Sequence, residues 1–357
     1  MSDCTEELIE HVLSARSSGD ALSIQGANSK AFSGRQAQGT VLDTSAHRGI
    51  IDYNPVELVL TARAATPLHE IQAALSEHGQ ILSFEPPNFA GQSTLGGTLA
   101  CNLSGPARPW GGSVRDHVLG LSLINGRGEL LRFGGRVMKN VAGYDVSRLQ
   151  AGAMGSLGLI TEISLKVLPG FAATVTLVFD CQADQAIGQL NRFAAESKPI
   201  SAAVWHDGRL TIRLSGAQSA VQATAEQWST KLGGGQLLEG ADQFWADLRD
   251  QRGAFFDGEA PLWRFSINST APQLPLAGTT LVDWAGALRW VRGEGDMHKM
   301  QQLAKDAGGE VSLFRGGDRS AEVLQAPATP VMAIQKRLKK TFDPDRVFNP
   351  GRSYSWL

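Results

Sequence analysis

Apolar residues recur along the chain at helical spacing in some stretches and in short strand-like runs in others. Leu8, Ile9, Val12 and Leu13 repeat at helical spacing, which predicts an amphipathic helix over residues 3–17. Thr66 and Pro67 match the N-cap and the first position of a second helix that ends near residue 78. Strands are predicted at residues 22–25, 41–42, 49–52, 57–62 and 81–84.

A β-hairpin is predicted after this region. Apolar positions alternate across residues 118–133, and the turn-forming sequence Asn-Gly-Arg-Gly interrupts them at residues 125–128. Residues 145–149 favour a short helix, and residues 159–167 favour a strand that ends before Pro169. The pattern thus closes a first unit near residue 172.

The sequence pattern changes from about residue 173, where predicted strands and helices alternate around hairpins. Strands are predicted at 175–181, 262–268, 287–293 and 310–315, a hairpin at 202–216 turning on Asp207-Gly208, and helices at 183–196, 217–232, 297–307 and 331–342. This pattern is typical of a separate α+β domain. The sequence therefore predicts an α+β protein with domains at 1–172 and 173–325 and a C-terminal segment at 326–357.

Composition removes several classes of function. The chain has 33 basic and 35 acidic side chains, so it lacks the positive charge expected of a nucleic-acid-binding protein. Its apolar runs are too short to span a bilayer, and its acidic N-terminus does not resemble a signal peptide. Cys4, Cys101 and Cys181 are far apart and form no CxxC motif, which favours a reduced, cytoplasmic protein without its own metal cluster. Trp205, Trp245, Trp263, Trp284 and Trp290 fit a core better than a partner interface.

Glycine clusters supply the candidate chemistry. Paired glycines and hydroxyls at residues 93–100 precede a short helix-capable run, and free N–H groups at a helix start favour phosphate. Gly152, Gly155 and Gly158 lead directly into the strand predicted at 159–167. The Gly-Ala-Asn-Ser-Lys sequence at 26–30 predicts a tight turn whose N–H groups converge, although an ordinary loop fits this segment equally well. Together these turns predict a pyrophosphate site on a β-rich scaffold.

Other nucleotide and hydrolase motifs do not fit. Gly152, Gly155 and Gly158 open a strand, whereas the Rossmann fingerprint opens a helix. The sequence has no phosphate-binding P-loop motif and no nucleophile-elbow serine motif. Its seven histidines are scattered without metal-ligand spacing, so no metal site is predicted.

A long ordered series of motifs resembles one family. PPNFAGQSTLGGTLACNLSG, NGRGELLRFGG and LQAGAMGSLGLITEISLKVLP, in this order, resemble the FAD-binding domain of the vanillyl-alcohol oxidase/p-cresol methylhydroxylase (PCMH) superfamily. Within it the match is to the FAD-binding subunits of bacterial glycolate oxidases (glycolate dehydrogenases), and the tail FDPDRVFNPGR resembles their C-terminal return segment. The resemblance implies a two-subdomain PCMH-type FAD-binding domain, a smaller α+β cap domain and a C-terminal segment that returns to the FAD domain.

The resemblance also implies a set of FAD-binding residues. They are Gly26, Ala27, Asn28, Ser29 and Lys30 in a first pyrophosphate loop; Pro87, Thr94, Gly96, Gly97, Ala100, Ser104 and Gly105 around a second segment; Arg115, Asp116, Val118 and Leu119 in the turn and backbone after it; and Gly155, Ser156 and Ile160 along the ribityl and adenosine portions. Family members often have three glycines in the first loop, so Ala27 is expected to weaken the binding of the phosphate by this loop. That loop lacks the His to which a tethered flavin is often joined, which implies non-covalent FAD. The turn at 143–145 is compatible with flavin contact or with a packed Tyr144.

The catalytic residues are less well defined. Relatives that oxidise 2-hydroxy acids transfer the α-hydrogen to the flavin while a base and a cation hold the substrate. Arg289 and Arg315 are candidates for a bidentate carboxylate contact, and Asn349 for a position near the flavin ring. The competing interpretation for each is a surface salt bridge or a turn residue. The metal-ligand pattern that some relatives carry in the second domain is missing.

Two function classes remain open from the sequence. The resemblance implies an FAD-binding subunit of a glycolate (2-hydroxy acid) dehydrogenase that oxidises glycolate to glyoxylate and passes electrons to an iron–sulfur subunit. Its expected partners are a larger FAD-linked subunit and that iron–sulfur subunit, and its expected location is the cytoplasm, peripheral at the inner membrane face through these partners. The alternative is a non-catalytic scaffold that keeps the FAD fold for assembly. A stand-alone NADPH-dependent reductase is weaker, because no nicotinamide site is visible.

Overall fold

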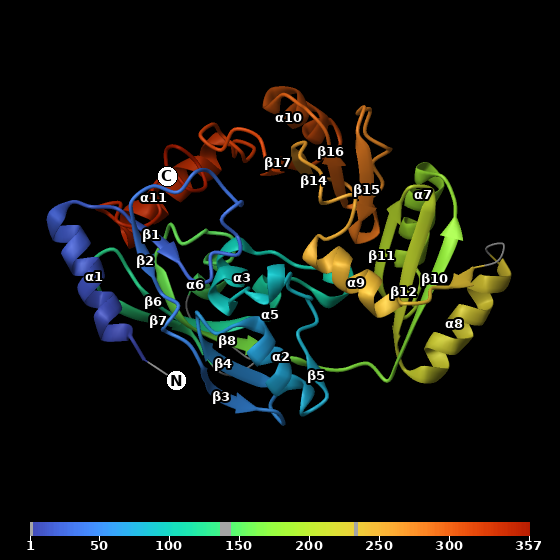
Figure 1. Cartoon of the computed structure of the whole chain (residues 1–357), viewed down its shortest axis with the longest axis horizontal. Helices are drawn as coiled ribbons and strands as arrows, with labels where there is room; N and C mark the ends of the chain where they lie inside the picture. Colours follow the sequence, from blue (N-terminus) through green and yellow to red (C-terminus); the bar gives the residue numbers. More distant parts are fainter. Residues whose placement is uncertain (1–2, 136–143, 232–234) are drawn as a thin grey trace.

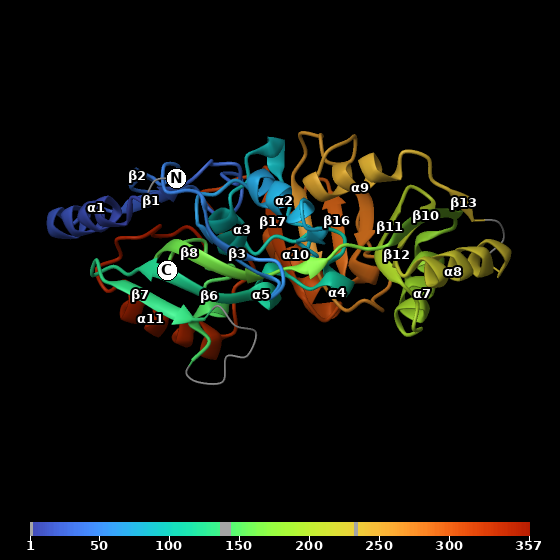
Figure 2. The same ribbon diagram turned by 90° about the horizontal axis from the view of Figure 1, so that it is seen from below.

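The computed structural model describes residues 3–135, 144–231 and 235–357. The molecule is elongated, with a first part built on a five-stranded sheet and a second part built on an eight-stranded sheet (Figures 1 and 2). After the second part the chain turns back, so that both termini lie with the first part (Figure 1). In the described residues, no helix is long and apolar enough to cross a membrane.

The first part combines the five-stranded antiparallel sheet with short helices. The sheet order is β3 (Ile50–Asn54), β4 (Val59–Arg63), β8 (Leu159–Lys166), β6 (Val118–Ile124) and β7 (Leu130–Gly134). Two further pairs are β1 (Leu22–Gln25) with β2 (Thr40–Asp43), which are parallel, and β5 (Gln80–Ile81) with β9 (Leu168–Pro169). The helices are α1 (Thr5–Ser18), α2 (Leu68–Ser76), α3 (Leu95–Cys101), α4 (Arg108–Gly111), α5 (Val114–His117) and α6 (Val146–Leu149), with a 3₁₀ turn η1 (Phe89–Gly91).

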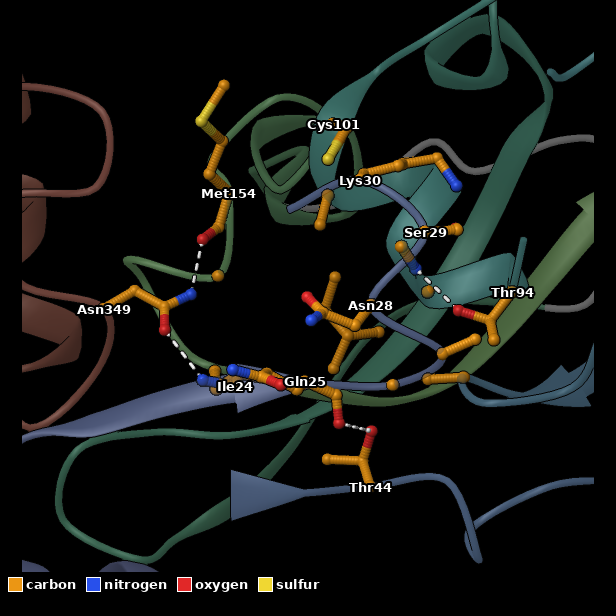
Figure 3. Close-up of a pocket in the computed structure, with 18 of the residues that line it drawn as sticks. Ile24, Gln25, Asn28, Ser29, Lys30, Thr44, Thr94, Cys101, Met154 and Asn349 are labelled. Atoms are coloured by element: carbon orange, nitrogen blue, oxygen red, sulfur yellow. Dashed lines mark hydrogen bonds between the residues drawn. The ribbon is translucent and has the colours of Figure 1, made fainter. Parts of the chain in front are cut away.

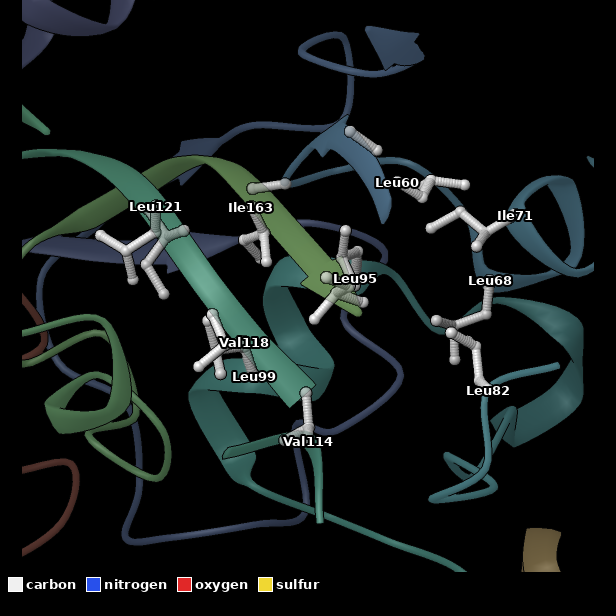
Figure 4. Packing of buried hydrophobic residues seen from close by; sticks show 14 of the residues in the cluster. Leu60, Leu68, Ile71, Leu82, Leu95, Leu99, Val114, Val118, Leu121 and Ile163 are labelled. Atoms are coloured by element: carbon white, nitrogen blue, oxygen red, sulfur yellow. The ribbon is translucent and has the colours of Figure 1, made fainter. Parts of the chain in front are cut away.

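The core of this part lies between the sheet and helices α2 and α3. Leu60 and Ile163 of the sheet, Leu68 and Ile71 of α2, and Leu99 of α3 are fully buried in one cluster (Figure 4). Alternate residues of a strand and every third or fourth residue of a helix point to the same side. The spacing of these buried residues follows these two repeats. This packing fixes α3 against the sheet, where the glycines of the candidate site lie.

The second part is an eight-stranded sheet with three of its helices on one face and one on the other. Its order is β13 (Gln236–Leu237), β10 (Ala173–Asp180), β12 (Arg209–Gly216), β11 (Ile200–His206), β15 (Thr279–Asp283), β16 (Leu288–Arg292), β14 (Leu262–Ser266) and β17 (Glu310–Arg315). The helices are α7 (Ala183–Ala194), α8 (Gln218–Lys231), α9 (Ala241–Asp250) and α10 (Met297–Asp306), with a 3₁₀ turn η2 (Trp284–Gly286).

The two faces of this sheet have different neighbours. Residues of α7, α8 and α10 pack on the face that carries Val282 and Val291. The opposite face carries Leu281 and Trp290, which are paired across β15 and β16, and it packs against the first part at Cys101 and other residues. Strand alternation therefore decides which side chains of the second part meet the first part.

The chain returns to the first part through α11 (Thr329–Phe342). Phe342 joins the core of the five-stranded sheet, and Val347 and Phe348 pack with α1. Leu22 of β1 forms an isolated parallel bridge with Phe348. The tail is thus a structural component of the first part.

Most predicted elements are confirmed, but several differ. The strand predicted at 81–84 is only the two-residue β5 (Gln80–Ile81), and the short helices α4 and α5 and strand β13 were not predicted. The predicted N-cap Thr66 is wrong: α2 begins at Leu68, and the Thr66 hydroxyl accepts the Gly49 N–H instead. Helix α9 and strand β15 were not predicted. Both hairpin turns and the core positions of the five tryptophans are confirmed, since Trp205, Trp245, Trp263, Trp284 and Trp290 are all buried.

Candidate functional site

An open pocket of about 860 Å³ lies in the first part, between β1, α3 and the C-terminal tail (Figure 3). Its walls come from six stretches distant in sequence. They are residues 24–31 with Ser33, Thr44, Ala64, residues Thr94, Gly96, Gly97, Ala100 and Cys101, residues Met154, Gly155, Gly158, Leu159 and Ile160, and tail residues Asn349 and Arg352.

Many of the residues that the sequence assigned to the cofactor meet in this pocket. They are Gly26, Ala27, Asn28, Ser29, Lys30, Thr94, Gly96, Gly97, Ala100, Gly155 and Ile160. Asn349, a catalytic candidate, also lines it. The structure thus brings together three predicted glycine-containing turns that are spread over residues 26–160 of the chain.

The loop at residues 26–30 is shaped to receive an anion. Asn28 has a left-handed backbone with φ 53°, as expected of an Asn that replaces glycine. Within the described part of the chain, the N–H groups of residues 27–30 donate no hydrogen bond. Successive free N–H groups in such a turn form an anion-binding concavity. The loop is therefore the best-fitted phosphate site in the pocket.

Lys30 adds a cation at the end of this loop. Its side chain is buried, and its Nζ donates to the Ser93 hydroxyl at 2.8 Å. Burial lowers the pKa of Lys30 to about 8. Because no carboxylate among the described residues pairs with it, a bound anion would stabilise its charged form.

The start of α3 does not offer the free N–H groups that the sequence predicted. Leu95 and Gly96 donate their N–H groups to the carbonyl oxygens of Thr66 and Ala64, and Gly97 donates to the Thr94 hydroxyl at 3.2 Å (Figure 3). The glycines instead allow close approach, since a Cβ on Gly96 would lie 2.7 Å from the Ala64 Cβ. Because these N–H groups already donate hydrogen bonds, the prediction of a phosphate site at the start of α3 is wrong. The loop at 26–30 is the best-fitted phosphate site instead.

Gly155 and Asn349 form the wall opposite that loop. The Asn349 amide donates to the Met154 carbonyl at 2.7 Å and accepts the Ile24 N–H at 2.8 Å (Figure 3). A Cβ on Gly155, whose φ is 70°, would lie 2.7 Å from the Asn349 Nδ2. Asn349 thus ties strand β1 to the turn at 154–155 and shapes the pocket wall.

Eight predicted cofactor residues do not line the pocket: Pro87, Ser104, Gly105, Arg115, Asp116, Val118, Leu119 and Ser156. The carboxylate of Asp116 caps α5 through Ser113, and Arg115 is exposed beside it. Val118 is buried in the core of the sheet, while the Ser156 hydroxyl donates to the Ala153 carbonyl.

Of the remaining four, Leu119 of β6 is half-buried, and Pro87, Ser104 and Gly105 lie toward the second part of the chain. Pro87 is buried, and a Cβ on Gly105 would lie 2.4 Å from the Glu85 carbonyl oxygen. Ser104 differs, because its hydroxyl is buried and has no partner among the described residues. Tyr144 is 95% exposed, so the predicted packed tyrosine is wrong, and Gly143 of the same turn lies outside the described residues.

The two arginine candidates are not in the pocket either. Arg289 is fully buried on the helix-covered face of the eight-stranded sheet, with its Nη2 donating to the Ala271 carbonyl. Strand alternation directs it away from the first part, so the structure contradicts its assignment as a substrate ligand. Arg315 donates to Gln251 and lies 4.5 Å from the Phe32 ring, next to the pocket wall but outside it. In the described ranges, no three His, Cys, Asp or Glu side chains gather as a metal-holding group.

Several pocket residues were missed by the sequence analysis. They include Thr44, Cys101, Met154 and Arg352. Arg352 follows Asn349 closely in the tail, so its position beside a predicted site residue was the available signal. Its guanidinium donates to the carbonyls of Arg35 and Ala31, which anchors the tail beside the 26–30 loop. Thr44 and Met154 enter through turns that no local pattern marks.

The residues present fit FAD. The free N–H groups of residues 27–30 suit a pyrophosphate, and the buried ammonium of Lys30 lies at the end of the same loop. Thr98 and Asn102, on the two sides of Cys101, each carry a buried side-chain oxygen without a partner in the described residues. Orphaned buried polar atoms are costly unless a ligand or water satisfies them.

Comparison with known proteins agrees with this geometry. Residues 3–134 match a family model described as an FAD binding domain. The chain is 46% identical over 355 residues to the glycolate oxidase subunit GlcE of Escherichia coli (strain K12), covering 99% of both chains. It is also 40% identical over 88 residues to the glycolate oxidase subunit GlcD of Bacillus subtilis (strain 168), covering 24% of this chain and 19% of that protein. These matches support FAD as the cofactor of the pocket.

The fold has solved relatives. The chain is similar to an alkyldihydroxyacetonephosphate synthase with a TM-score of 0.68 and 15% sequence identity, covering 97% of this chain and 74% of that one. This likeness shows the predicted α+β, PCMH-type fold. Two of the sequence relatives are named as subunits of an oxidase, which implies partner subunits.

Proposed function

We propose a function from one premise: the chain belongs to the family of the glycolate oxidase subunit GlcE. In this proposal it is the FAD-binding subunit of a glycolate (2-hydroxy acid) dehydrogenase that oxidises glycolate to glyoxylate. The observation that supports it most is the full-length match together with a pocket lined by the predicted glycine turns. The larger FAD-linked subunit and the iron–sulfur subunit are its proposed partners.

The chain's own residues divide the work of holding the cofactor. The N–H groups of residues 27–30 would receive the pyrophosphate, with the Lys30 ammonium beside them. Gly155 and Asn349 would form the wall along the middle of the cofactor. Bound FAD supplies a two-electron acceptor, and the protein's part is to orient it and exclude water.

The attachment of FAD is proposed to be non-covalent. The loop from Gly26 to Gly34 contains no histidine, and no histidine lines the pocket as the structure describes it. FAD that is recovered intact after denaturation and filtration would support this, and flavin that stays with the denatured chain would contradict it. The protein is further proposed to work in the cytoplasm, peripheral at the inner membrane face through its partners.

A visible spectrum of the purified chain, followed by anaerobic glycolate addition, tests the function. Bleaching by glycolate alone would make this chain a catalytic subunit. Bleaching that requires the larger subunit would make it an electron relay. A chain that takes up no FAD even after reconstitution would overturn the redox proposal and leave the alternative, a scaffold for assembly of the complex.

A further inference from the structure

The sheet face that meets the first part carries an arginine in an unusual place. Arg264 lies in β14, and its cross-strand partner is Trp290 of β16. Because paired residues share a face, Arg264 points with Trp290 toward the first part of the chain. It is half-buried there, whereas Trp263 and Phe265 on either side of it point to the helix-covered face.

A second arginine approaches the same place from the first part. The Arg108 guanidinium of α4 lies 4.4 Å from the ring centroid of Trp284, and the Arg264 guanidinium lies 5.0 Å from the same ring. Arg264 also lies 6.0 Å from the Trp290 ring. As far as the chain is described, neither guanidinium donates a hydrogen bond or has a carboxylate within salt-bridge distance. The N–H donors of both guanidinium groups are therefore available to bind another group.

The neighbouring acids are already engaged. Glu85 pairs with Arg213 at 2.6 Å, and Asp250 pairs with Arg249 at 2.7 Å. Asp283 is the remaining acid at this interface; its carboxyl accepts the Trp284 N–H, and burial raises its pKa to about 8.

Asp116, whose charge acts on Arg108, accepts both the N–H and the hydroxyl of Ser113. The positive charge of Arg108 and Arg264 is therefore left without a paired anion. An anion bound there would stabilise both charges, and most strongly that of the half-buried Arg264.

The backbone at Trp284 is held in a strained conformation. Trp284 and Ala285 are consecutive left-handed residues with φ of 51° and 54°, which is rare for a bulky side chain. The Trp284 Nε1 donates to the Gly105 carbonyl of the first part at 3.0 Å, which holds the indole next to both arginines. Strain of this kind clusters at functional sites, because the surrounding structure must maintain it.

This interface also adjoins the cofactor pocket. Cys101, which lines the pocket, packs in the same cluster as Trp284 and Trp290. Between Cys101 and Gly105 lie Asn102 and Ser104, whose buried side-chain oxygens have no partner among the described residues. Two orphaned polar side chains thus lie on the chain segment that leads from pocket residue Cys101 to Gly105, whose carbonyl holds Trp284.

We propose that Arg108 and Arg264, with the Trp284 indole between the two domains, form a binding site for a small carboxylate. This inference rests on the proposed function, because the ligand class it names is the carboxylate of the 2-hydroxy acid or of its 2-oxo product. Guanidinium groups recognise carboxylates through charge-assisted and bidentate hydrogen bonds. Glycolamide, which lacks the charge but keeps the shape, should not bind.

Tryptophan fluorescence of the flavin-free full chain tests this site. Glycolate and oxalate are titrated into the wild type, R264M, R264K, R108M and the control R209M, which removes an exposed arginine of β12. We expect a saturable change in the wild type and in R209M, roughly tenfold weaker binding in R264M and R108M, and an intermediate effect in R264K. Equal titrations in R264M and R209M, or equal binding of glycolamide and glycolate, would overturn the proposal.

Two controls keep this outcome separate from that of the proposed function. Each variant's FAD affinity is measured in parallel, and it should equal that of the wild type because neither arginine lines the pocket. If R264M does not fold, R108M decides, since Arg108 is on the surface. Carboxylate binding without FAD binding would contradict the proposed function but support this site. FAD binding without any carboxylate effect would support the proposed function but contradict this site.

Discussion

The Lys339 ammonium and the Asp343 carboxylate lie 2.7 Å apart in the interior, where both side chains are buried. The Lys339 Nζ also donates to the carbonyls of Ser156 and Phe348. Asp343 in turn accepts the N–H groups of Val347 and Phe348. This pair fixes the chain just before Asn349, and so it positions one wall of the cofactor pocket.

Replacing Lys339 with Met should be strongly destabilising. The change leaves the Asp343 carboxylate buried without its cation, which typically costs about 3–5 kcal/mol. FAD affinity should fall as well, because the tail carries Asn349. Urea unfolding and flavin titration measure the two effects. The control is Arg16→Met, which breaks the exposed Arg16–Asp345 pair of the same length and should cost at most about 1 kcal/mol. Equal effects of the two substitutions would refute this account of the tail.

Gly155→Ala should reduce FAD binding through the pocket wall. A Cβ at this position would lie 2.7 Å from the Asn349 amide nitrogen, and the φ of 70° disfavours any L side chain. We expect a loss of about 1–3 kcal/mol in stability and a weaker FAD titration. Gly188→Ala is the matched control, because Gly188 lies in α7 with open space around its Cβ position. That change should stabilise the chain by about 0.5–1 kcal/mol.

FAD affinity should depend on pH through Lys30. Burial lowers the pKa of this ammonium to about 8 in the free protein, and an anion beside it favours the protonated form. FAD binding should therefore take up protons and weaken as the pH rises above about 8. Flavin fluorescence titrations between pH 7 and 9.5 measure the trend, which Lys30→Met should flatten. A slope that persists in this variant would remove Lys30 from the phosphate site.

Stability should fall with pH through Asp283. Its folded-state pKa of about 8 lies above the ordinary value of 3.8, so the folded chain holds a proton that the unfolded chain releases. Between about pH 4 and 8 this group lowers the free energy of unfolding as pH rises, by up to about 1.4 kcal/mol per pH unit. Asp283→Asn should remove that contribution, and its stability relative to the wild type should increase from pH 5 to 8. A constant difference would show that Asp283 titrates normally.

Local sequence chemistry predicted the turns and the glycine-containing walls of the pocket. Asn28 adopts the left-handed conformation for which its type is suited, and the Asp207-Gly208 turn closes its hairpin. Helix α9 was missed because its apolar residues Phe244, Trp245 and Leu248 are few, and it becomes stable by packing on the domain interface.

Long-range geometry accounts for the rest. Arg289 and Arg264 are both arginines in strands, and only the pairing of the strands shows that Arg264 faces the first part. The N–H groups at the start of α3 looked free in sequence, yet Thr66 and Ala64, some thirty residues earlier, accept two of them. Such contacts depend on tertiary packing, which a local pattern does not encode.

We expect the pocket of this chain to bind FAD without a partner subunit. Equilibrium titration of the flavin-free chain with FAD, followed by flavin fluorescence and by the amount retained on filtration, tests it most directly. We expect saturation at one FAD per chain. The FAD affinity of Gly188→Ala should equal that of the wild type, and the FAD affinity of Gly155→Ala should be weaker. Titrations with no saturable binding, or with Gly155→Ala indistinguishable from Gly188→Ala, would contradict it.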